Sequence, residues 1–348
     1  MPPPIGTRPP VVTTPRTAPP PPPPVSTPTT TAQPAQSKPA VADAFQVGTT
    51  KADAIKGKLD KVEADLAPKY TVKVDGKDVS VNSPTPFRMN GGDQQPTPEE
   101  AAKKMTKTLQ KAGQWPKNAA AAKELDQAIV RNAYGRASPK QIELVTNKLI
   151  DSGALQPYLD ELKKGGATIG PKELGVAIRR MQWDNGVGTD CNGVCRIAYQ
   201  EINGKPPTPD WGGELIKTDR NGNSLNPNLK KVSVDDAKPG DLIKLDDLHG
   251  DVGHNVVVTD AKTISAADVK KDGYTGSPAP VGPLKAVTVL SSFGAGGNKD
   301  NTDSGLHKET WVFDKGSNKW GTLNGKNVEW SSSPGPYEHK FVGVYRAK

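Results

Sequence analysis

The sequence contains little cysteine and no long apolar run. Two of its 348 residues are cysteines, Cys191 and Cys195, so a fold held together by several disulfides is excluded. Two thiols are also too few to bind a structural zinc ion with cysteine ligands alone. Since no stretch of about 18 apolar residues occurs, we predict no membrane-spanning helix.

The first residues also lack the features of a conventional signal peptide, because MPPPIGTRPP has neither a basic n-region nor an apolar h-region. We therefore expect a cytosolic protein, or one secreted by a route that does not use a signal peptide. Proline, in contrast, is abundant here: 15 of the 34 prolines lie among the first 40 residues. Such a segment cannot form a helix or bury a core, so residues 1–41 are predicted to be a disordered Pro/Thr-rich tail.

The net charge of +8 comes from one half of the sequence. Residues 1–184 carry 26 basic and 18 acidic side chains, whereas residues 185–348 carry 20 of each. The basic residues are dispersed among acidic ones, and only 5% of all residues are aromatic. A nucleic-acid-binding protein would usually show a basic stripe with interleaved aromatics, so we expect no nucleic-acid partner.

The pattern of apolar residues changes from helical to strand-like along the chain. Helical spacing predicts helices over Ala42–Leu66, Pro98–Ala112, Ala119–Tyr134, Pro139–Ser152, Leu155–Lys164, Pro171–Met181 and Asp190–Ile202, with Thr97 and Ser138 as the N-caps of the second and fourth. Alternation predicts a hairpin over Tyr70–Val81 and later strands over Asp241–Leu245, His254–Asp260, Ala286–Ser292, Glu309–Phe313 and Lys340–Arg346. We predict an α+β fold with an antiparallel sheet, divided into residues 1–41, 42–96, 97–182 and 183–348.

The stretch Gly188–Cys195 has the strongest chemical character. Its glycine-rich approach places Cys191 at the start of an apolar helix, where the helix dipole is expected to lower the pKa of the thiol. Backbone N–H groups at that position can also stabilise an oxyanion. Cys195, one turn further on, is expected to be a packing residue. His254 opens a strand and can reach the start of a helix packed across the sheet, which would give the thiol a base.

Three motifs in this order resemble the NlpC-like and CHAP-like families of papain-fold cysteine hydrolases, most of which act on peptidoglycan. They are Asp190-Cys191-Asn192-Gly193, Pro239-Gly240-Asp241-Leu242 and Gly253-His254. Trp183 resembles the aromatic residue that lies upstream of the cysteine in these families. The resemblance covers residues 180–346 and implies a papain-like domain that needs no metal or cofactor.

The resemblance implies that Cys191 is the nucleophile and that His254 is its base. Asn192 departs from the family pattern, in which serine is commonest, and the family's third polar residue is not obvious. Asp260 lies about 20 Å along the strand from His254 and cannot orient the imidazole. If the strand Ala286–Ser292 pairs antiparallel with that of His254, then Ser292 would take the third position.

Other assignments around this site stay open. Ser291, His307 or Glu309 are alternatives to Ser292 as the third residue. We expect Asp190, Trp183 and Trp211 to contact substrate, although Trp183 is equally consistent with a core position. His249, His307 and His339 are expected at the surface, with a cleft position as a second interpretation for His307.

The first hypothesis is therefore a cysteine hydrolase that cleaves amide bonds in peptidoglycan stem peptides. It would act as a secreted bacterial effector, toxin or lysin, with an immunity protein or a component of a secretion machine as a partner. A second hypothesis is a Cys-His effector that acts on a host protein as a protease, deamidase or acyltransferase. A third is an inactive domain of the same fold that binds a partner.

Overall fold

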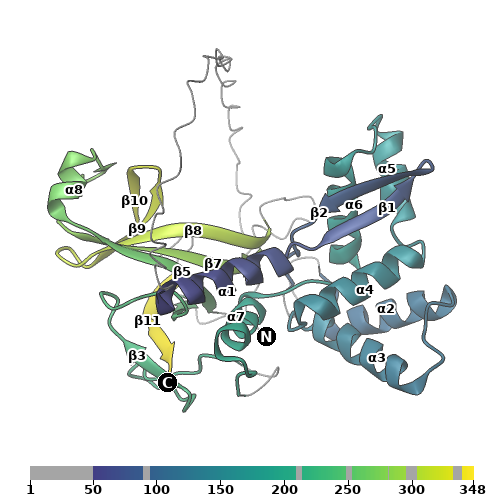
Figure 1. Ribbon diagram of the computed structural model, residues 1–348, viewed down its shortest axis with the longest axis horizontal. Coiled ribbons are helices and arrows are strands. Elements are labelled where there is room, and N and C mark those ends of the chain that lie inside the picture. The colour runs from purple at the N-terminus through teal and green to yellow at the C-terminus, as the bar shows by residue number, and fades with distance from the viewer. Residues whose placement is uncertain are drawn as a thin grey trace, which may run out of the picture. The chain divides into compact units, whose positions relative to one another are not determined.

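A computed structural model of the chain describes residues 50–88, 95–208, 214–247, 253–280, 282–294, 304–331 and 339–348 (Figure 1). The chain divides into two units, Met1–Gly48 and Thr49–Lys348, and the description below concerns the second. The tail predicted for residues 1–41 lies outside the described residues. Within the described part of the chain, no helix combines the length and the apolar character needed to cross a bilayer.

The helices begin where capping residues and prolines predict. They are α1 (Lys51–Asp65), α2 (Pro98–Lys111), α3 (Ala119–Ala133), α4 (Pro139–Asp151), α5 (Gln156–Lys164), α6 (Pro171–Asp184), α7 (Cys191–Asn203) and the short α8 (Ala266–Lys271). Thr97 and Ser138 each close a capping box at the start of a helix whose first residue is proline. The seven predicted helices are thus confirmed, except that α1 begins at Lys51 after the Thr50 cap rather than at Ala42; residues 42–49 lie outside the described residues.

A small hairpin and a large sheet contain the strands. The hairpin of β1 (Lys69–Val74) and β2 (Lys77–Asn82) turns at Asp75-Gly76, as predicted, where both residues have positive φ. The large sheet contains β3 (Leu229–Val232), β4 (Leu242–Asp247), β5 (His254–Ile264), β6 (Thr275–Gly276), β7 (Leu284–Phe293), β8 (Gly305–Asp314), β9 (Lys319–Asn324), β10 (Asn327–Ser331) and β11 (His339–Ala347). The α+β class is therefore confirmed.

The order of the large sheet is β3-β11-β4-β5-β7-β8-β9-β10-β6. Its neighbours are antiparallel except for β6, which runs parallel to β10, so the sheet is mixed and the prediction of a purely antiparallel sheet is wrong at this edge. The strand β6 has only two residues. It follows α8 in the chain and pairs with β10 at one edge of the sheet. The predicted antiparallel pairing of β5 with β7 is confirmed, with Val257 opposite Leu290.

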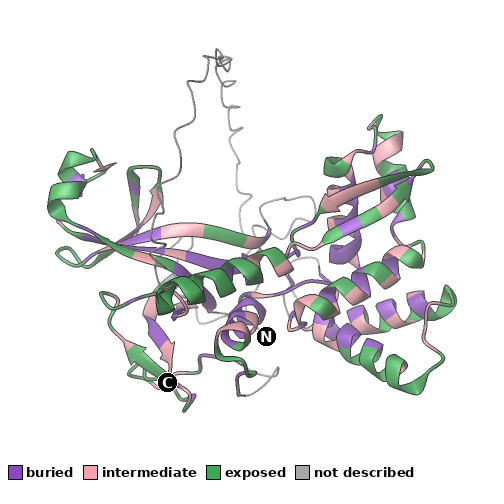
Figure 2. Cartoon of the chain, in the orientation of Figure 1, coloured by how far each residue is buried: buried purple, intermediate pink, exposed green. Residues whose placement is uncertain are grey.

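Two helices cover one face of the large sheet. α7 packs on β5 and β7, and α1 packs on α7 and β5, so Val194, Cys195 and Ala198 of α7 share a core with Val257 and Leu290. Figure 2 shows α7 largely buried, whereas α1 exposes its outer side. The same apolar cluster continues into α2–α6, so the helical region and the sheet share a core.

A second apolar cluster fills the opposite face of the sheet. It contains Val256 and Val258 of β5 and, on more distant strands, Trp311 and Trp320. The ring of Trp320 on β9 lies 4.9 Å from that of Phe341 on β11, centroid to centroid. Because β9 and β11 are separated by four strands in the sheet order, the sheet must curl around this cluster.

Candidate active site

The N-terminus of α7 is fixed by Asp190. Its side chain caps the helix by accepting the N–H of Gly193 at 2.6 Å, and it also pairs with the guanidinium of Arg136. Both side chains are nearly buried, at 14% and 12% exposed. The structure therefore gives Asp190 a capping and pairing role, rather than the open position expected of a substrate contact.

The segment before Cys191 is held from several sides. Thr189 donates its N–H to the carbonyl of Pro86 and accepts the N–H of Arg88, while Asp190 donates its N–H to Gly135. These partners come from the helical region and the preceding loop. That part of the chain, whose role the sequence did not reveal, thus positions the candidate nucleophile.

Close packing explains the glycine in the Asp190–Gly193 motif. A Cβ at Gly193 would lie 2.3 Å from the carbonyl oxygen of Gly135 and 2.3 Å from the hydroxyl oxygen of Thr189. Because Gly135 and Thr189 lie on segments that are held by hydrogen bonds, a larger residue would push the start of α7 out of position. The side chain of Asn192 is also fixed, since its Oδ1 accepts the N–H of Leu215 at 3.1 Å.

The thiol of Cys191 is buried at the first position of α7, with 9% of the residue exposed. Burial raises its pKa to about 12, and the charge of Asp190 adds to this effect. The backbone N–H groups of Asn255 and Asn192 and the charge of Arg136 act in the opposite direction and lower this pKa. The prediction of a lowered pKa is therefore wrong for this conformation, because desolvation outweighs the helix terminus.

Cys195 packs in the core, as predicted. It is fully buried among the residues that join α7 to the sheet, and burial raises its pKa well above the ordinary value. Both cysteines are free thiols. Among the described residues, no three His, Cys, Asp or Glu side chains gather as the ligands of a metal ion would.

His254 lies at the strand end that α7 covers, but its side chain starts from the other face of the sheet. It pairs with Leu245, a member of the second apolar cluster, and it alternates in phase with Val256 of the same cluster. Its ring meets that of Phe293 edge-on, at 5.5 Å between centroids.

Asn255 is a residue that the sequence analysis missed. It occupies the α7 face of β5, in phase with Val257, and its backbone N–H lowers the pKa of the Cys191 thiol. The residue is 5% exposed, and its buried Oδ1 accepts no hydrogen bond from the residues that the structure describes. Buried polar atoms of this kind are rare and often belong to functional sites. The sequence does not show which face of β5 carries Asn255, because residues 256–258 are all valine and the run has no alternation.

Ser292, the predicted third residue, has another partner. Its hydroxyl is fully buried and donates to the carbonyl oxygen of Thr189 at 2.7 Å, so its single proton is used in holding the segment before Cys191. Ser292 faces α7 in phase with Leu290, whereas Ser291 has the phase of the opposite face. Ser291 lies opposite His307 in the β7–β8 pairing, and His307 is 3.8 Å from the carboxylate of Glu309.

The remaining candidates divide between core and undescribed positions. Trp183 lies in α6 and is 5% exposed, which favours the core interpretation over a cleft wall. Asp260 pairs with Lys56 of α1, remote from the start of β5 as expected. Trp211 and His249, and the side chain of His339, lie outside the described residues.

Comparison of the chain with family models, curated proteins and solved structures found no match. The assignment of a function to this site therefore depends on its residues and their geometry.

Proposed function

We propose that the chain is a cysteine hydrolase of papain-like fold that cleaves amide bonds in peptidoglycan stem peptides. The observation that carries the proposal is the position of Cys191. It begins a capped helix that packs across β5, and the backbone N–H of Asn255, the residue next to His254, acts on the pKa of its thiol. Thiol nucleophilic catalysis requires a base within hydrogen-bond reach of the sulfur, and His254 at the first position of β5 is the proposed base.

In the proposed reaction, the sulfur of Cys191 attacks the amide carbonyl while its proton passes to the imidazole of His254. The oxyanion accepts hydrogen bonds from N–H groups at the start of α7. Collapse breaks the C–N bond, and the imidazolium returns the proton to the leaving amine. Water then hydrolyses the thioester, which restores the thiol and releases a carboxylate.

The raised pKa of Cys191 defines how this reaction must start. The thiol is neutral at pH 7, so its proton has to leave as the sulfur attacks, or after the site gains water. The proposal also requires His254 to reach the sulfur around the end of β5, since its Cβ lies on the other face. A bound substrate that displaces the groups covering Cys191 would favour both the loss of the thiol proton and the approach of His254 to the sulfur.

We further propose that this activity serves a secreted effector, toxin or lysin that acts on bacterial cell wall. The peptidoglycan substrate comes from the resemblance of the three motifs to the NlpC-like and CHAP-like families. The partner that an effector or toxin would imply is an immunity protein or a component of a secretion machine. The support is the order of the three motifs together with the α+β arrangement that places them on α7, β4 and β5.

The test is digestion of purified peptidoglycan sacculi by the full chain, with mass spectrometry of the released muropeptides. We expect new fragments from the wild type and none from Cys191→Ala, while Cys195→Ala retains activity because that thiol is a packing residue. Thiol-specific labelling of Cys191 without fragment release would favour a protein or acyl substrate. Absence of both fragments and labelling would contradict every enzymatic interpretation.

A further inference from the structure

A cavity of about 410 Å³ lies at the end of α7 opposite to Cys191. At about 1.5 Å of rise per residue, the helix separates Cys191 from Asn203, which lines the cavity, by about 18 Å. Its walls come from α1, the end of α7, the turn before β4 and the last residues of the chain. The lining residues are Lys51, Ala54, Ile55, Lys58, Ile202, Asn203, Lys238, Pro239, Gly240, Asp241, Arg346, Ala347 and Lys348. Its volume is in the range of small-molecule sites.

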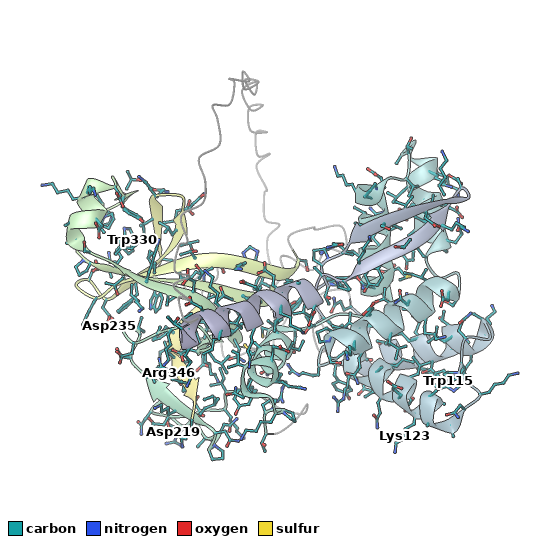
Figure 3. All side chains as sticks on the ribbon, viewed as in Figure 1. Trp115, Lys123, Asp219, Asp235, Trp330 and Arg346 are labelled. Carbon is teal, nitrogen blue, oxygen red and sulfur yellow. The ribbon has the colours of Figure 1, made fainter. Side chains whose placement is uncertain are left out.

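The cavity wall carries unbalanced positive charge. Its one acidic side chain, Asp241, is 1% exposed and accepts two hydrogen bonds from Arg346, at 2.7 and 2.8 Å, so these two charges cancel. Arg346, a residue of this wall, is labelled in Figure 3. The four other charged residues of the wall are lysines: Lys51, Lys58, Lys238 and Lys348. None of the four pairs with a carboxylate in the part of the chain that the structure describes.

The base of the cavity is apolar and closely fitted. Ile55 of α1 and Ile202 of α7 meet there at Gly240, whose φ of +91° favours glycine. A Cβ at this position would lie 3.2 Å from a methyl group of each isoleucine. The glycine thus allows the turn before β4 to close the base, while Lys58 donates to the carbonyl of Ile202 at 2.9 Å and ties the two helices together.

We propose that this cavity binds an amphiphilic organic anion, an apolar group that carries a carboxylate or a phosphate. The lysines attract the anionic group, and the isoleucine base takes the apolar part. Carboxylate and phosphate ligands share this chemistry, and a probe of each kind distinguishes them. Because Cys191 lies at the other end of α7, binding here does not depend on the proposed hydrolase activity.

The test is calorimetric titration of the full chain with octanoate, octyl phosphate, octanol and inorganic phosphate. We expect at least one of the two alkyl anions to bind in a salt-sensitive manner, and octanol and inorganic phosphate to bind at least about tenfold more weakly. Equal binding of inorganic phosphate would overturn the role of the apolar base. Absence of binding by both alkyl anions at millimolar concentration would overturn the site.

A pair of charge-reversal variants locates the binding. Lys51→Glu with Lys238→Glu is expected to weaken binding of the alkyl anion at least about tenfold. Lys103→Glu with Lys107→Glu, two exposed residues of α2, gives the same change in net charge and is expected to leave the affinity within about twofold. Thermal melting confirms that each variant is folded. Equal loss in both variants would show attraction by net charge alone and would overturn the site, whereas Cys191→Ala should bind like the wild type.

Discussion

The two ends of α7 differ in how their polar groups are satisfied. At the N-terminal end, Thr189 is buried, Asp190 and Arg136 are nearly buried, and all three are hydrogen-bonded to one another or to neighbouring segments. At the C-terminal end, the helix stops at Gly204 in the left-handed conformation, and the lysines that line the cavity pair with no carboxylate in the described part of the chain. The polar groups at the first end are therefore satisfied within the protein, whereas the second leaves its charges available to a ligand.

Removal of the Arg136 side chain should lower the free energy of unfolding more than any other change at the two ends of α7. Arg136→Ala leaves the carboxylate of Asp190 nearly buried without its cation, which should lower the free energy of unfolding by about 3 kcal/mol. Lys238→Ala at the open end removes an exposed, unpaired charge and should change it by less than about 0.5 kcal/mol. Urea unfolding followed by circular dichroism measures both. Similar losses would show that the two ends do not differ in this way.

The pH dependence of the free energy of unfolding should also reflect the burial of Asp190 at the N-terminal end of α7. Burial raises the pKa of the Asp190 carboxyl from its ordinary value of 3.8 to about 6 in the folded protein. The folded state holds this proton more tightly than the unfolded state. The contribution of Asp190 to stability is therefore present at a pH below its pKa in the unfolded state, and it is lost as the pH rises through its pKa in the folded state. Asp190→Asn should therefore flatten the change in unfolding free energy between about pH 4 and about pH 6.5. An unchanged profile would contradict the assignment.

The reactivity of the thiol gives a smaller, kinetic contrast. In Asp190→Asn the asparagine can still cap α7, but the negative charge that raises the pKa of Cys191 is gone. Alkylation of Cys191 by iodoacetamide at neutral pH should then become about tenfold faster, because a larger fraction of the thiol is ionised. Peptide mass spectrometry follows it, with the fully buried Cys195 as an internal control. A wild-type rate equal to that of a free thiol would contradict the buried state.

Much of the fold follows from local sequence signals. Pro98 after Thr97, and Pro139 after Ser138, mark helix starts that the structure reproduces to the residue. The β9–β10 hairpin was missed although Asn324-Gly325 marks its turn, because the flanking residues mix polar and apolar side chains on an exposed edge. β6 was missed for a stronger reason: two residues at an edge have no pattern of their own.

The candidate site was only partly predictable. The sequence indicated Cys191 at a helix start and the pairing of β5 with β7, and both are present. It could not show that Arg136, 54 residues before Asp190, would supply the charge that holds the cap. Nor could it fix which face His254 occupies, because a strand buried on both faces reads as a continuous apolar run.

Two asparagines near Cys191, Asn192 and Asn255, can be compared directly. The Oδ1 of Asn192 accepts a hydrogen bond, whereas that of Asn255 accepts none from the described residues. Asn192→Ala removes the acceptor of the buried N–H of Leu215 and should lower the free energy of unfolding by about 1–2 kcal/mol. Asn255→Ala removes an amide whose Oδ1 has no hydrogen-bond partner among the described residues, so the free energy of unfolding should change by less than about 1 kcal/mol. If the amide of Asn255 serves the reaction, however, the same variant should lower kcat at least about tenfold with little change in KM, as measured by the rate of muropeptide release. A stability loss as large as that of Asn192→Ala would instead make Asn255 a structural residue, and an unchanged kcat would remove it from the site.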